Sequence, residues 1–188
     1  MKTITNSPSR MAAGLLTAIL GLLLTLSASA QSKKDVEKLE KEVAEAITNI
    51  KKADSTIAAF FDSAAGYAVL PRVGKGGFIV GGARGTGLVY EKGKRVGYVV
   101  MSQATVGAQI GGQSFSEVIF FETADALKGF QNSEFTMSAQ VGAVAAAEGV
   151  AKNAKYQQGV VIFTLARSGL MAEASVGGQK FNYTALSE

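Results

Sequence analysis

The sequence predicts an α+β protein in which N-terminal helices pack on a curled, mostly antiparallel β-sheet or partial barrel, with one short helix inserted. Two observations support this fold class. Apolar residues recur every three or four positions within residues 31–53, as is typical of an amphipathic helix. From Gly66 onward the chain is rich in glycine and its apolar runs become short, as is typical of β-strands separated by turns.

Residues 1–30 have the pattern of a cleaved signal peptide. A positively charged start precedes the apolar run Met11–Leu26, and the small residues Ala28 and Ala30 form a cleavage site. The run is shorter than the roughly 20 residues that a membrane-spanning helix needs. We therefore expect cleavage before Gln31 and a periplasmic or secreted protein; a retained membrane anchor is the alternative.

Two helices are expected at the start of the mature chain. Residues 31–53 form the amphipathic helix, with Ser32 as its cap. Asp54 has a side chain suited to cap a second, shorter helix over Ser55–Ser63. Residues 54–188 then form the main domain.

The main domain is expected to be built mostly from short strands. They are Tyr67–Leu70, Gly77–Gly82, Thr86–Glu91, Arg95–Ser102, Val106–Gly112, Glu117–Glu122, Phe135–Ala145, Val160–Ala166, Leu170–Val176 and Lys180–Thr184. A tight charged turn joins two strands at Glu91–Arg95, and Thr123 caps the inserted helix Ala124–Phe130. The alanine-rich segment Ala145–Val150 is ambiguous between strand and helix.

Composition excludes several classes of function. The chain has no cysteine and no histidine, which excludes a Ser-His-Asp triad, a Cys-His pair, a typical zinc site and a lipid-bearing cysteine. Without residues 1–30 the 19 basic residues fall to 17 against 15 acids, a net charge of about +2. That charge is too small for a nucleic-acid partner bound by bulk electrostatics. No cofactor and no metal are expected.

Four motifs follow one another in a specific order: Ala65–Pro71, Gly77–Gly82, Val106–Gln113 and Val118–Phe121. This order resembles the SYLF domain family, a lipid-binding domain also found in yeast and animal proteins of the cortical actin machinery. The resemblance extends over roughly Asp54–Thr184. One departure is Ala65, which stands where many members have lysine.

The resemblance implies non-enzymatic binding of a phospholipid or another acyl lipid in the cell envelope, at a membrane surface. Six basic residues are the candidates to meet an anionic headgroup: Arg72, Lys75, Arg84, Lys92, Lys94 and Arg95. They form such a site if their loops lie at one end of the sheet. Otherwise these charges merely keep the sheet soluble. The N-terminal helix alternates bases with acids, which favours packing on the sheet over membrane contact.

Other functions remain as alternatives. The protein is either an envelope scaffold with unknown protein partners or, less favoured, a small outer-membrane β-barrel. Four acids lie within or beside apolar strands: Glu117, Glu134, Glu148 and Glu173. A converging pair of them would suit glycoside hydrolysis or calcium binding. No spacing identifies such a pair, and a glutamate in a strand more often points to solvent.

Overall fold

The computed structural model describes residues 34–77, 80–106, 111–132, 136–137, 143–145, 148–166 and 179–186. Contact density divides the chain after Lys38, and Leu39–Glu188 form the compact unit considered below. Residues 34–38 are helical. The expected signal peptide, the Ser32 cap and the expected strand Leu170–Val176 lie outside the described residues. None of the described helices is both long and apolar enough to span a membrane.

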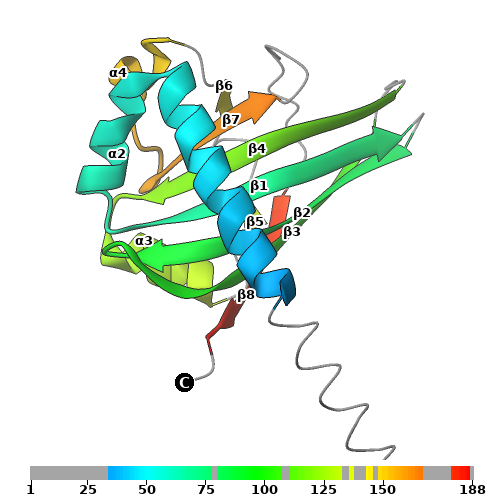
Figure 1. Ribbon diagram of the computed structural model, residues 1–188, viewed down its shortest axis with the longest axis horizontal. Coiled ribbons are helices and arrows are strands. Elements are labelled where there is room, and N and C mark those ends of the chain that lie inside the picture. The colour runs from blue at the N-terminus through cyan, green and yellow to red at the C-terminus, as the bar shows by residue number, and fades with distance from the viewer. Residues whose placement is uncertain are drawn as a thin grey trace, which may run out of the picture. The chain divides into compact units, whose positions relative to one another are not determined.

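The described chain is α+β, as expected, with one sheet and several helices (Figure 1). The N-terminal helix extends over residues 34–53. The other elements are η1 (Ser55–Ile57), α2 (Ala58–Ser63), β1 (Gly66–Gly77), β2 (Val80–Glu91), β3 (Lys94–Val106), β4 (Gly111–Phe121), α3 (Ala124–Gln131), β5 (Thr136–Met137), β6 (Ala143–Ala145), α4 (Val150–Asn153), β7 (Val160–Ala166) and β8 (Gln179–Ala185). In the alanine-rich segment, Ala145 ends β6, residues 148–149 form a turn and Val150 begins α4.

The sheet has the strand order β5-β8-β3-β2-β1-β4-β7-β6. Its neighbours are antiparallel except β6 and β7, which run parallel. The expected strand Gly77–Gly82 is wrong, because Gly77 ends β1 and pairs with Gly81 of β2 after the chain has reversed. The expected strand Val106–Gly112 is wrong for a similar reason: its first residue ends β3 and its last two belong to β4.

Caps and turns agree with the local sequence signals. The Thr123 hydroxyl accepts a hydrogen bond from the backbone N–H of Ala126, which caps α3 as expected. Asp54 caps η1 through the N–H of Thr56 at 3.0 Å. Between β2 and β3 the turn residues Lys92 and Gly93 both have positive φ, which is the geometry of a tight hairpin.

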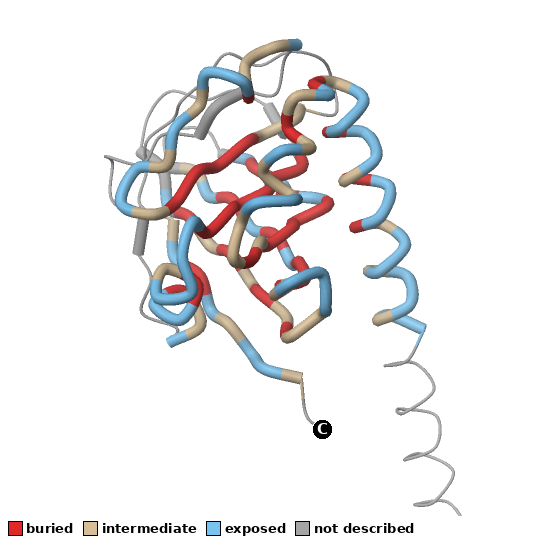
Figure 2. The backbone as a smooth tube through the Cα atoms, turned by 90° about the vertical axis from the view of Figure 1, so that its left-hand side faces the viewer, coloured by how far each residue is buried: buried red, intermediate tan, exposed pale blue. Residues whose placement is uncertain are grey.

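One face of the sheet is covered by helices, and we call it the helix face. Its core is built from the N-terminal helix, α4 and the central strands, and the buried stripe of the N-terminal helix is visible in Figure 2. Its buried residues are Val43, Ala46, Ile50, Ile57, Val69, Leu88, Val118, Phe120, Ala151, Val161 and Phe163. Phe60 of α2 packs its ring against Phe120, with centroids 5.4 Å apart.

The opposite face is the concave face, because the sheet curls around it. Gln179 of β8 donates a hydrogen bond to Glu117 of β4 at 3.1 Å, although β3, β2 and β1 lie between these strands in the sheet. Helix α3 also covers this face, with Leu127 and Phe130 buried. Close approach of β1 and β2 requires Gly87, since a Cβ there would lie 2.2 Å from the carbonyl oxygen of Val69.

Candidate functional site

The six candidate basic residues do not form one cluster. Arg72 and Lys75 lie within β1 and not in a loop, because that strand continues through an irregularity in its pairing at Val69/Arg72. Arg84 lies in β2, opposite Gly74 of β1. The other three, Lys92, Lys94 and Arg95, belong to the β2–β3 hairpin at the opposite end of the β1–β2 pair from Gly77.

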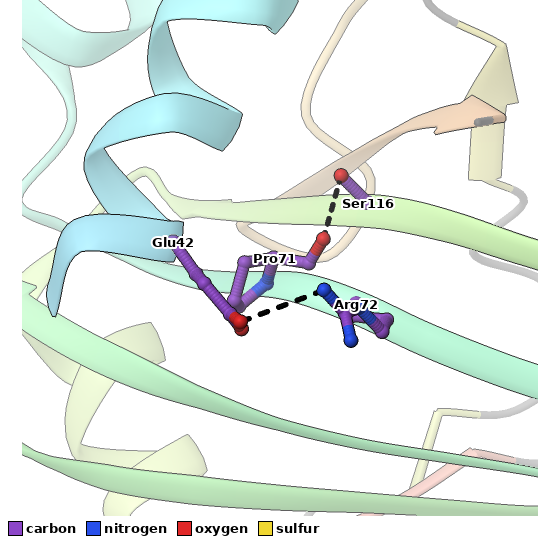
Figure 3. A network of polar contacts seen from close by, with 4 residues as sticks. All are labelled: Glu42, Pro71, Arg72 and Ser116. Carbon is purple, nitrogen blue, oxygen red and sulfur yellow. Dashed lines mark hydrogen bonds and ion pairs between the residues drawn. The ribbon is translucent and has the colours of Figure 1, made fainter. Parts of the chain in front are cut away.

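Arg72 projects from the helix face toward the N-terminal helix. Its guanidinium lies 3.5 Å from the Glu42 carboxylate (Figure 3). The backbone beside it is held by a hydrogen bond from the Ser116 hydroxyl to the Pro71 carbonyl, at 2.8 Å. The Arg72 side chain remains 55% exposed, so this ion pair is largely screened by water.

Arg95 also contacts the N-terminal helix. It forms an ion pair with Glu40 and lies over the ring of Tyr98, 5.8 Å from its centroid. Two of the six bases are therefore engaged by acids of the helix that precedes the sheet. This confirms that the N-terminal helix, from Leu39 onward, packs on the sheet.

Lys75 lies on the other side of the sheet. It pairs with Ala83 of β2, a residue of the concave core, and is only 8% exposed. The expectation that Lys75 occupies a surface loop is wrong, because the pairing irregularity in β1 sets which residues after Pro71 face inward. Of the six candidate bases, three are exposed and make no side-chain hydrogen bond or ion pair within the described part of the chain: Arg84, Lys92 and Lys94.

Glu117 is a buried polar residue that the sequence interpretation placed in solvent. It is fully buried on the concave face, where it pairs with Leu70 and Thr164 of the neighbouring strands. Burial raises the pKa of its carboxyl to about 7, and the hydrogen bond from Gln179 opposes this effect. The alternation of side chains along β4 indicates the burial of Glu117, because Glu117 lies on the same face of the sheet as the buried Ile119.

The remaining acids do not gather around Glu117 in the described part of the chain. Glu148 is exposed in a turn, whereas Glu134 and Glu173 lie outside the described residues. Within the described ranges no three acids are close enough together to hold a metal ion.

Residues 102–184 match the family model Ysc84, described as "Las17-binding protein actin regulator". The match extends over 83 of the 188 residues, so this part of the chain is similar to the SYLF (Ysc84) family. The matched region starts at Ser102 in β3 and includes Glu117 and Gln179, but it begins after all six candidate bases. The SYLF family is linked to lipid and protein binding, and it is not a known enzyme family.

Beta cell expansion factor A of Aeromonas veronii is 32% identical to this chain over 123 residues. The aligned part is 64% of this chain and 46% of that protein. The chain thus spans about half the length of this curated relative.

Proposed function

We propose that this protein binds anionic phospholipid at a membrane surface without catalysing a reaction, and that the β2–β3 hairpin makes the contact. The observation that carries the proposal is the exposure of Lys92 and Lys94 at the tip of a tight turn, with Arg95 next to them. The link of the SYLF family to lipid binding supports the same function.

The hairpin suits a flat charged surface better than the other bases do. Arg72 is paired with an acid and Lys75 is buried, whereas Lys92 and Lys94 extend from the end of two long strands. Each lysine near an anionic leaflet contributes roughly 1 kcal/mol, and the contribution falls off within a Debye length of about 8 Å at physiological salt. Binding through the hairpin is therefore expected to weaken strongly as salt rises.

Flotation with liposomes tests this proposal. The variant K92Q/K94Q removes two charges from the tip and leaves the Arg95–Glu40 pair in place. The matched control is K152Q/K155Q, which removes two charges from exposed positions just before β7, a strand that β1 and β4 separate from β2 in the sheet. Both are compared with the wild type on phosphatidylcholine liposomes that contain increasing fractions of phosphatidylglycerol, at low and physiological salt.

The tip variant is expected to lose about ten- to thirtyfold in affinity at low salt, corresponding to two contacts of roughly 1 kcal/mol each. The control is expected to bind like the wild type. Equal flotation of the tip variant and the control contradicts a role for the hairpin. A wild-type protein that binds none of these liposomes contradicts lipid binding and leaves the scaffold that binds protein partners.

The location of the protein belongs to the same proposal. Contact with envelope lipid requires export, which the pattern of residues 1–30 indicates. The intact mass of the protein recovered from the envelope or medium is expected to correspond to a chain that begins at Gln31. A mass that includes residues 1–30 contradicts cleavage.

A further inference from the structure

Strand pairing places side chains in rows across the concave face. One row consists mainly of polar residues, and we call it the polar row: Gln113, Lys75, Ala83, Gln103 and Gln179. The next row inward is apolar: Phe115, Val73, Gly85, Met101 and Phe181. Gln113 at one end of the row is exposed and Gln179 at the other end is half-buried, whereas Lys75, Ala83 and Gln103 between them are buried. The row is therefore buried in its middle and reaches solvent at its ends.

The carboxylate of Glu117 is directed toward this polar row. Its backbone lies one row deeper than Phe115, yet its Oε2 accepts a hydrogen bond from the Gln179 amide. Its other oxygen, Oε1, is inaccessible to solvent and has no hydrogen-bond partner in the described part of the chain.

An orphaned carboxylate oxygen in the interior is costly. A buried acceptor without a donor loses the hydrogen bond that it makes with water, and a buried charge without a counter-charge costs more. A neutral hydroxyl or a water molecule compensates the first cost alone. A primary ammonium compensates both, because it brings N–H donors and a positive charge.

We propose that Glu117 and Gln179 form an internal binding site for a primary ammonium group, carried either by a soluble amine or by the headgroup of an aminolipid. Glu117 Oε1 accepts one N–H of the ligand. The Gln179 side chain donates to Glu117 Oε2 through its amide nitrogen, and its amide oxygen is a further acceptor for the ligand. The apolar residues Met101 and Phe181 form part of the adjoining row and suit a short alkyl chain.

A titration of the ¹⁵N-labelled protein with n-butylammonium chloride, followed by NMR at pH 8, tests the site. The side-chain amide signals of Gln179 and the backbone amide of Glu117 are expected to shift and to saturate. The matched ligand is n-butyltrimethylammonium, which has the same charge and chain but no N–H donor. Absence of saturable shifts with the primary amine, or equal binding of the quaternary one, overturns the proposal.

Two variants separate the site from general charge effects. Glu117→Gln removes the charge and places an amide at the orphaned position, so n-butylammonium is expected to bind at least about tenfold more weakly. Glu122→Gln removes the same charge from an exposed residue just after β4 and is expected to bind like the wild type. Equal binding by both variants overturns the proposal. The comparison of n-butylammonium with n-butyltrimethylammonium uses the wild-type protein alone, so it tests the site even if a variant does not fold.

The source of the ammonium is found with net-neutral vesicles of phosphatidylcholine, with and without phosphatidylethanolamine. Stronger binding to the vesicles that contain phosphatidylethanolamine, lost in Glu117→Gln, supports the site with an aminolipid as ligand. Binding of n-butylammonium without this preference supports the site with a soluble amine as ligand. These vesicles carry no net charge, so the result is independent of the hairpin and of the anionic-lipid proposal.

Discussion

Replacing Glu117 with glutamine is expected to remove a large pH dependence from the stability of the protein. Burial raises the pKa of this carboxyl from 4.5 to about 7, so the folded state holds the proton more tightly than the unfolded state does. Stability from this group is therefore fully present below pH 4.5 and is lost as the pH rises through 7. A difference of 2.5 pKa units corresponds to about 3 kcal/mol.

Urea unfolding at pH 5 and pH 8 measures this effect. Between these two pH values the wild type is expected to lose about 2 kcal/mol or more relative to Glu117→Gln, since most of the linkage falls within this interval. Glu122→Gln is the control, because that residue is exposed and the variant is expected to follow the wild type. The comparison of slopes is insensitive to a constant cost of burying the new amide.

Parallel pH profiles for the wild type and Glu117→Gln would refute the reasoning. Such a result would mean that the carboxyl has a similar proton affinity in the folded and unfolded states. The burial of Glu117, and with it the interior site, would then be in doubt.

Three further expectations concern the packing of the sheet and its helices. Gly87→Ala is expected to destabilise the protein by several kcal/mol in urea unfolding, because the new Cβ meets a β1 carbonyl, whereas Gly74→Ala meets nothing within 4 Å and is the control. Asp54→Ala is expected to cost about 3 kcal/mol, because it removes the cap of η1 and a 2.7 Å hydrogen bond to the α4 backbone; a loss below about 1 kcal/mol would contradict that role. A double-mutant cycle on Glu42 and Arg72 is expected to give less than about 1 kcal/mol of coupling, since the pair is exposed, and a larger value would show that it is desolvated.

Features with a local cause were predictable from the sequence. Asp54 and Thr123 cap their helices because each side chain accepts a hydrogen bond from a backbone N–H in the first turn of the helix. Strand β7 has the bounds that were expected, Val160–Ala166, because an apolar run ends at both sides in turn residues. The charged hairpin was recognised because Lys92-Gly93 provides the positive φ values that a two-residue turn needs.

Features set by strand pairing were not predictable in this way. Glycine is frequent on both sides of the β1–β2 reversal, so its pattern gives no single turn position. Which face Lys75 and Glu117 occupy depends on a pairing irregularity in β1 and on the curl that brings β8 opposite β4. The ion pairs of Arg72 and Arg95 join residues 30 and 55 positions apart, beyond the range of any local signal.

The position of β8 affects how the chain reaches its native state. This strand closes the concave face, and its Tyr183 hydroxyl bonds to the carbonyl of Val96, 87 residues earlier. Until the C-terminal segment has been synthesised, β3 has an unpaired edge and the Glu117 carboxyl lacks the hydrogen bond from Gln179. Pairing over such a separation is slow, and an open edge can pair with another chain. Truncation before Gln179 is therefore expected to yield a protein that self-associates, and slow refolding is expected even of the complete chain.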